Sequence, residues 1–230
     1  MISKGGERMK IGKNLSRLSI GAVLLGASLM PVQSSAEVLA FDTAWKEQGF
    51  LRLWSNEFIL GGEQLQVVSD GTVSLLYRPL PRALWGARSA SWKWAVSNSV
   101  VATDLTLKGG DDRNLAMYFL FVDEATAEKL SKKSALKLLR NKSTRALVYV
   151  WGGDYSRGTV LTSPYGPPSL KMVIRRSAGV GEFAEKVDLI ADFKRAYGDE
   201  PGVLVGIGIT ADSDDTKGRI DATVSAINLL

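Results

Sequence analysis

The chain has 230 residues and a formal net charge of +5, and it contains neither Cys nor His. Without these residues no disulfide supports the fold. A Ser-His-Asp or Cys-His nucleophilic site is excluded, and so is a zinc site of the usual His or Cys type. A chain of this length is nevertheless sufficient to bury a core in one domain.

Residues 1–36 have the pattern of a cleavable secretory signal peptide. Basic residues up to Arg17 precede the uncharged run 18–32, which is shorter than the roughly 20 apolar residues of a membrane-spanning helix. Ser34 and Ala36 place small side chains at −3 and −1 of a cut before Glu37. We expect export to the periplasm or beyond; an uncut signal anchor is the alternative.

Cleavage changes the charge of the protein. The segment holds five basic residues and one acid, which leaves 24 basic and 23 acidic residues in the mature chain. The basic character of the whole sequence therefore gives no reason to expect a nucleic-acid partner or an anionic membrane surface.

Residues 37–230 are expected to form a single domain, because no linker divides them. Short blocks of hydrophobic alternation separated by Gly, Asp, Ser and Pro favour a mainly β fold, an antiparallel jelly-roll-like β-sandwich with one or two added surface helices. The expected strands are 65–69, 73–77, 89–96, 115–122, 146–151, 171–176, 203–211 and 220–229.

Three local patterns make this expectation specific. Asp70-Gly71 between the first two strands predicts a two-residue hairpin, because both residues tolerate positive φ. Trp92 and Trp94 alternate onto one face of their strand, which indicates core packing. The run 115–122 is apolar on both faces and is typical of a central strand.

Two helical segments are expected beside the sheets. Residues 124–142 combine apolar residues with many lysines, which favours a surface helix or helical pair. Residues 183–197 repeat apolar side chains at helical spacing, and Gly198 follows where a left-handed residue ends a helix.

Several short segments form a recognisable set: 91–94 (SWKW), Thr103-Asp104, 108–113 (KGGDDR) running into 115–122, 149–152 (YVWG), 163–165 (SPY) and the Asp-rich segment within 207–216. On these segments the sequence resembles a bacterial protein family, domain of unknown function 3047. The resemblance covers nearly all of the mature chain but implies no activity. Ala211 and the Gly218-Arg219 pair depart from the family pattern around the Asp-rich loop.

The loop 108–113 is the first candidate binding site. Its two glycines permit tight backbone geometry, and Asp111, Asp112 and Arg113 offer hydrogen-bonding groups for sugar hydroxyls or a hard cation. The alternative is a structural turn in which an Asp-Arg ion pair ties two loops together.

The Asp-rich loop 212–216 is the second candidate. It lacks the Gly and Glu of an EF-hand, so that motif is excluded. Antiparallel pairing of the adjoining strands would bring it beside loop 108–113, where Asp112, Asp212 and Asp214 would offer ligands for one Ca²⁺. Solvated turn acids are the alternative.

Aromatic side chains are the third candidate. Among six Trp residues, Trp85 in the Pro-rich loop 79–87 is predicted to be an exposed platform for a sugar ring. Tyr165 is assigned to the same ligand-binding set as Trp85, Asp111, Asp112 and Arg113.

The sequence favours a non-catalytic domain that binds a glycan or another polar envelope ligand. One alternative is a carbohydrate-active hydrolase or lyase, which needs two facing carboxylates across a cleft. Another is a structural envelope protein with a flat apolar surface. Beyond Ca²⁺, no cofactor is expected.

Overall fold

The structure, a computed structural model, describes residues 37–50, 54–130, 135–166 and 168–230. The predicted signal peptide therefore lies outside the described residues. Those from Glu37 to Leu230 belong to one compact unit. None of the helices that the structure describes is long and apolar enough to cross a membrane.

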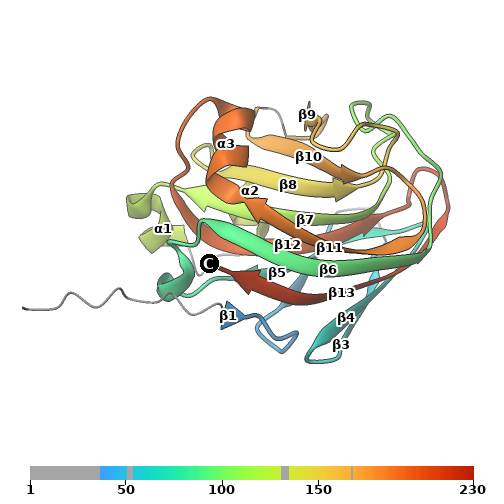
Figure 1. Cartoon of the computed structure of the whole chain (residues 1–230), viewed down its shortest axis with the longest axis horizontal. Coiled ribbons are helices and arrows are strands. Elements are labelled where there is room, and N and C mark those ends of the chain that lie inside the picture. Colours follow the sequence, from blue (N-terminus) through green and yellow to red (C-terminus); the bar gives the residue numbers. More distant parts are fainter. Residues whose placement is uncertain (1–36, 51–53, 131–134, 167) are drawn as a thin grey trace, which may run out of the picture. The chain divides into compact units, whose positions relative to one another are not determined.

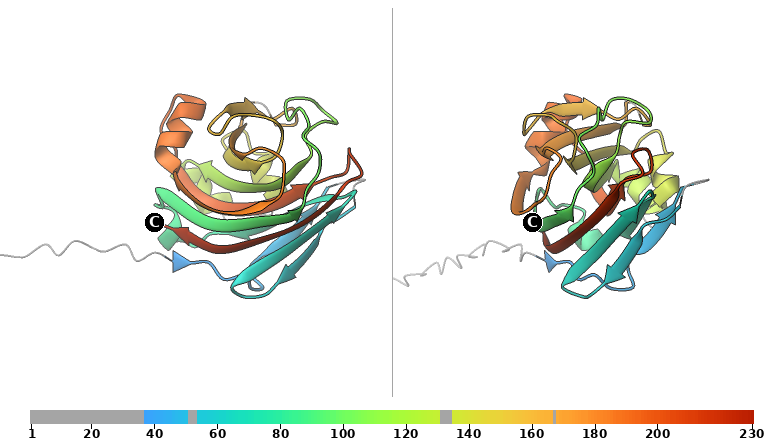
Figure 2. Two further views of the ribbon diagram at one scale, coloured as in Figure 1. Left: turned by 45° about the vertical axis from the view of Figure 1, so that its right-hand side comes forward. Right: turned by 90° about the vertical axis from the view of Figure 1, so that its right-hand side faces the viewer.

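The fold is a jelly-roll-like β-sandwich of two sheets, as predicted (Figure 1). The smaller sheet has the order β11-β6-β13-β4-β3, with β1 paired to β13, and the larger has the order β2-β5-β12-β7-β8-β10-β9. Pairing is antiparallel except between β8 and β10, which run parallel. Figure 2 shows that the sheets curve together around the core between them.

The strand bounds extend the predicted blocks by a few residues. The smaller sheet consists of β1 (Glu37–Val38), β3 (Glu57–Leu60), β4 (Gln64–Asp70), β6 (Ser89–Asn98), β11 (Gly181–Asp188) and β13 (Arg219–Leu229). The larger sheet consists of β2 (Lys46–Gly49), β5 (Val73–Pro79), β7 (Arg113–Val122), β8 (Arg145–Trp151), β9 (Val160–Thr162), β10 (Leu170–Arg176) and β12 (Val203–Asp212).

Aromatic side chains fill the space between the sheets. Trp92 and Trp94 are each 1% exposed, and their rings meet edge to face at 5.3 Å. Trp92 also contacts Phe119 of β7 and Tyr149 of β8 from the opposite sheet. The predicted central position of β7 is confirmed, since it lies between β12 and β8 and is buried along its whole length.

The predicted hairpin at Asp70-Gly71 is wrong. Gly71 does turn with a positive φ of 62°, but β4 and β5 belong to different sheets. They pair instead with β13 and β12, respectively. An alternating pattern shows that one face of a strand is buried, but it does not show which strand lies beside it.

The helical predictions are partly right. The segment 124–142 forms α1 (Glu124–Leu130) and α2 (Ala135–Leu139), with residues 131–134 outside the described part. In the other segment only α3 (Leu189–Tyr197) is helical, with Asp188 as its N-cap and Gly198 left-handed at its end. Residues 183–188 belong to β11, where pairing with β6 overrides their helical spacing. The 3₁₀ turn η1 (Arg82–Leu84) follows β5.

Candidate functional site

The two acidic loops lie together at one end of the sandwich, as predicted. Strands β7 and β12 pair antiparallel and bring Arg113 opposite Asp212. The carboxylate of Asp112 accepts hydrogen bonds from the Thr216 N–H at 2.8 Å, the Thr216 hydroxyl at 2.5 Å and the Asp215 N–H at 3.3 Å. The Asp112 side chain therefore fastens one loop to the other.

Arg113 contacts most of the polar side chains at this end of the sandwich. Its guanidinium lies 3.1 Å from Oδ2 of Asp111 and 3.0 Å from Oδ2 of Asp212, and it donates to the Tyr118 hydroxyl at 3.2 Å. Burial alone would lower the pKa of Arg113, but Tyr118, Asp212 and Asp111 together raise it above its ordinary value. Arg113 is thus a fixed positive charge.

Asp212 is the most perturbed acid of the site. Burial, together with the neighbouring carboxylates of Asp214 and Asp111, raises the pKa of Asp212 to about 9 against the lowering effect of Arg113. The Oδ1 atom of Asp212 is buried and has no hydrogen-bond donor, and a carboxylate oxygen of Asp214 lies within 4.8 Å of one of Asp212. Carboxylates this close repel each other when both are ionised, which favours a protonated Asp212 or a cation between them.

The three carboxylates predicted to hold a cation come together. One oxygen each from Asp112, Asp212 and Asp214 lies within 4.8 Å of the others. We call these three residues the carboxylate cluster. Oxygen ligands of this kind suit Ca²⁺, although Asp112 and Asp212 already have protein partners.

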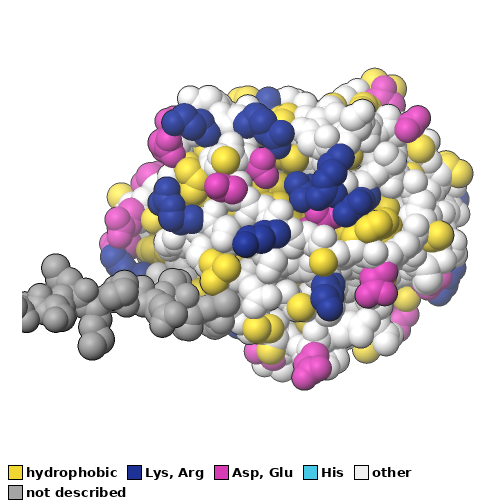
Figure 3. All heavy atoms as spheres, viewed as in Figure 1, with side chains coloured by type: hydrophobic (Ala, Val, Ile, Leu, Met, Phe, Trp, Pro, Cys, Tyr) yellow, Lys and Arg dark blue, Asp and Glu magenta, His cyan; other side chains and the backbone are white. Residues whose placement is uncertain are grey.

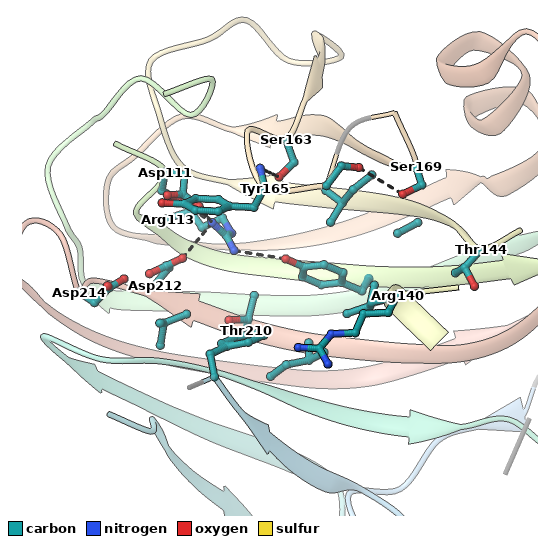
Figure 4. A pocket seen from close by; sticks show the side chains of 18 of the residues that line it. Asp111, Arg113, Arg140, Thr144, Ser163, Tyr165, Ser169, Thr210, Asp212 and Asp214 are labelled. Atoms are coloured by element: carbon teal, nitrogen blue, oxygen red, sulfur yellow. Dashed lines mark hydrogen bonds and ion pairs between the residues drawn. The ribbon is translucent and has the colours of Figure 1, made fainter. Parts of the chain in front are cut away.

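A pocket of about 500 Å³ opens beside the cluster on the outer face of the larger sheet. Tyr118 points outward into it because its neighbour Phe119 packs inward on Trp92. In Figure 4, Asp111, Arg113, Asp212 and Asp214 occupy one end, and Arg140, Thr144 and Ser169 occupy the other. Its remaining lining is Phe50, Val73, Leu75, Tyr118, Leu139, Ala146, Ser163, Tyr165, Gly166, Leu170, Thr210 and Asp215.

Glycines keep the strands beneath this pocket close together. A Cβ on Gly152 would lie 2.6 Å from the Cβ and 2.9 Å from the Cα of Arg113. A Cβ on Gly206 would lie 2.2 Å from the Tyr77 hydroxyl. Both positions leave no space for a side chain, and Gly152 directly permits the placement of Arg113.

The predicted ligand-binding residues separate into two groups. Asp111, Arg113 and Tyr165 line the pocket, whereas Asp112 is fully buried and is not part of the lining. The prediction for Trp85 is wrong, because this side chain is 8% exposed and its indole N–H donates to the Leu80 carbonyl at 3.0 Å. The apolar residues around Trp85 bury its ring instead of presenting it.

Sequence reasoning missed one exposed aromatic side chain and one buried group of ion pairs. Trp54 is 81% exposed, although nothing in its local pattern distinguishes it from the buried tryptophans. Glu185 is buried among Arg157, Arg175 and Arg176, within a group of Lys and Arg side chains over β6, β10 and β11 (Figure 3). Its helical spacing concealed that it belongs to a strand.

Solved structures resemble this fold only in outline. The xyloglucanase domain of NopAA from Sinorhizobium fredii, in complex with cellobiose, is 10% identical with a TM-score of 0.45, covering 84% of this chain and 97% of its own. The family 11 carbohydrate-binding module of Lic26A-Cel5E from Clostridium thermocellum is 10% identical with a TM-score of 0.43, covering 85% and 94%. The family 11 xylanase from Neocallimastix patriciarum is 10% identical with a TM-score of 0.41, covering 81% and 99%. These likenesses say nothing about the ligand of this chain.

Sequence comparison gives a firmer assignment. No curated protein matches the chain in sequence. A family model described as "Protein of unknown function (DUF3047)" matches residues 43–228. The match covers most of the chain and agrees with the resemblance carried by the SWKW, KGGDDR and YVWG segments. The chain therefore belongs to the DUF3047 family.

Proposed function

We propose that this protein is exported to the periplasm and binds a glycan or a similar hydroxyl-rich envelope ligand in the pocket, without transforming it. The observation that carries the proposal is the combination of surfaces within one pocket. Phe50, Leu75 and Leu170 supply apolar walls, while Asp111 and Arg113 supply fixed acceptors and donors. Binding pockets of this kind combine apolar contact with a few well-placed polar groups.

The polar end is preorganised for recognition. The Arg113 guanidinium is held by Asp111, Asp212 and Tyr118, so it loses little side-chain freedom when a ligand binds. Sugar hydroxyls both donate and accept hydrogen bonds, which suits neighbouring carboxylate and guanidinium groups. The hydrocarbon faces of sugar rings would pack against the apolar walls.

Hydrolysis of a glycan is the competing function, and the raised pKa of the buried Asp212 carboxyl favours it. A protonated carboxyl beside a second carboxyl is the pair that glycoside hydrolysis uses. However, a general acid must come within hydrogen-bonding reach of its substrate. The Oδ1 atom of Asp212 is closed off from the pocket space by surrounding protein, so binding without catalysis accounts for the site better.

A glycan array probed with the purified exported chain, with and without EDTA, tests the proposal. Arg140→Ala removes an exposed guanidinium that lines the pocket, so it should lower the affinity for each glycan that the wild type binds. Lys142→Ala is the matched control, because Lys142 is exposed but does not line the pocket. An array without any glycan signal, or equal binding by both variants, would contradict the proposal. Release of shorter sugars from a bound glycan would favour hydrolysis instead.

A further inference from the structure

Trp54 has an unusual environment for its residue type. Its side chain is 81% exposed, whereas the other five tryptophans of the chain are at most 8% exposed. Large aromatic side chains bury more apolar surface than any others, and they are enriched in interaction sites when they remain exposed. An exposed indole therefore offers a flat apolar face on which a ligand can stack.

The backbone of Trp54 adjoins a strand that lines the pocket. Its carbonyl accepts a hydrogen bond from the N–H of Val73 at 3.0 Å, and Val73 lines the pocket. Val73 is the register partner of Asp212 on β12. Because neighbouring strands lie about 4.8 Å apart, the backbone of Trp54 lies about 10 Å from that of Asp212.

The segment that carries Trp54 is fixed to the sheet. The backbone N–H of Asn56 donates to the Ser74 hydroxyl at 3.0 Å, and its side-chain amide donates to the Ala211 carbonyl at 2.9 Å. Asn56 itself is 5% exposed. The exposed indole is thus attached to an anchored backbone two residues away, which limits the entropy lost on binding.

A second exposed aromatic lies on the other side of the polar end. Tyr165 lines the pocket, is 61% exposed, and accepts a hydrogen bond through its hydroxyl from the Gly109 N–H at 3.2 Å. Gly109 precedes β7, whereas Trp54 adjoins β5, and β12 lies between these strands. The segments that carry the two exposed aromatic residues therefore adjoin β5 and β7, on either side of β12.

The charge of the lining restricts the ligand. Four acidic and two basic residues line the pocket, namely Asp111, Asp212, Asp214 and Asp215 against Arg113 and Arg140. Even with Asp212 protonated, three acids face two bases. An acidic polysaccharide would place its carboxylates or sulfates beside these acids, which is unfavourable. A neutral or amino-bearing sugar avoids this repulsion.

We infer that the ligand is a neutral or amino-bearing oligosaccharide that extends beyond the pocket, with an outer sugar ring stacked on Trp54. This inference rests on the proposed function, because it assumes that the pocket takes a glycan. It adds the length and charge of that glycan and identifies Trp54 as a binding residue outside the pocket.

Three hexasaccharide probes test the inference: cellohexaose as the neutral probe, a chitosan hexamer as the amino-bearing probe, and hexagalacturonate as the acidic probe. Each is titrated into the exported chain by calorimetry and by tryptophan fluorescence. Trp54 is the solvent-exposed indole, so a stacked ring should shift the emission to shorter wavelength and protect it from acrylamide. The acidic hexamer should bind most weakly.

Substitutions of Trp54 test whether its indole contributes to hexasaccharide binding. Trp54→Ala should weaken binding of the preferred hexamer about tenfold but leave the affinity for the corresponding disaccharide unchanged, since loss of one stacked aromatic ring is worth about this factor. Trp54→Phe keeps a ring and should retain most of the affinity. Ile59→Ala is the control, because Ile59 is 46% exposed on β3 of the other sheet.

The outcomes distinguish this inference from the proposed function. If a hexamer binds with equal affinity to wild type and Trp54→Ala, or if hexagalacturonate binds most tightly, the inference is wrong while glycan binding stands. If none of the three hexamers and no array glycan binds the wild type, both fail together.

Discussion

Gly152→Ala is the substitution that tests most directly how the site is held in place. Gly152 follows β8 and faces the start of β7, where the added methyl group would lie 2.6 Å from the Cβ of Arg113 and 2.9 Å from its Cα. Ordinary van der Waals contact begins near 3.4 Å, so the two segments must separate by most of an ångström. The neighbouring atoms belong to or adjoin the backbone and cannot rotate away.

The expected cost is that of overpacking a buried site, about 1–3 kcal/mol of unfolding free energy. For a domain of this size, each kcal/mol lowers the melting temperature by about 2–4 °C. Displacement of Arg113 also lengthens its contacts with Asp111 and Asp212, so glycan affinity should fall together with stability.

Thermal denaturation of Gly152→Ala beside Gly86→Ala provides the measurement. Gly86 is the matched control, because a Cβ there meets nothing within 4 Å and its φ is not in the left-handed region. Gly86→Ala should be neutral or slightly stabilising, since Ala restricts the unfolded chain. Equal melting temperatures for the two variants would show that the approach of Gly152 to Arg113 is not what positions this arginine.

Three other predictions concern charge and processing. Burial alone would raise the pKa of Glu185, but hydrogen bonds from Arg157 and Arg175 outweigh it and hold this pKa below its usual value. The ionised Glu185 therefore stabilises the fold fully above about pH 4.3, and this stabilisation is lost as the pH falls through the lowered pKa. Glu185→Gln should therefore cost on the order of 2 kcal/mol at pH 7 and progressively less in acid, and a cost that does not change with pH in urea titrations would contradict this. Added Ca²⁺ should raise the melting temperature and EDTA should lower it, more strongly as the pH approaches 9, where Asp212 loses its proton. Melting curves that Ca²⁺ and EDTA leave unchanged between pH 6 and 9.5 would show that the site binds no cation. Intact mass of periplasmic protein should give a chain that begins at Glu37, whereas residues 1–36 retained in the membrane fraction would refute cleavage.

The sequence by itself determined the fold class and most of the strands. Alternation over residues 89–96 placed Trp92 and Trp94 in the core, and the fully apolar run 115–122 defined the central strand β7. These features depend on the two-residue period of a strand and on the burial of apolar side chains, both of which are local. The same reasoning placed the two acidic loops at one end, because antiparallel neighbours bring such loops to the same edge.

Tertiary structure alone decided which strands pair and which side chains are buried. The turn at Gly71 exists, but it carries the chain from one sheet to the other, since β13 and β12 are better partners than β4 and β5 are for each other. Residues 183–188 became a strand through pairing with β6, which a helical spacing cannot reveal. Pairing energy depends on segments far apart in the chain.

The exposure of single aromatic residues was equally beyond the sequence. Trp85 follows a proline-rich segment and is buried, while Trp54 lies in an unremarkable stretch and is exposed. Whether an indole meets solvent depends on the elements that fold over it, and the local sequence does not specify them. For the same reason the carboxylates of the site could be identified from the sequence, but the pocket beside them, with its Tyr118, Thr210 and Arg140 lining, could not.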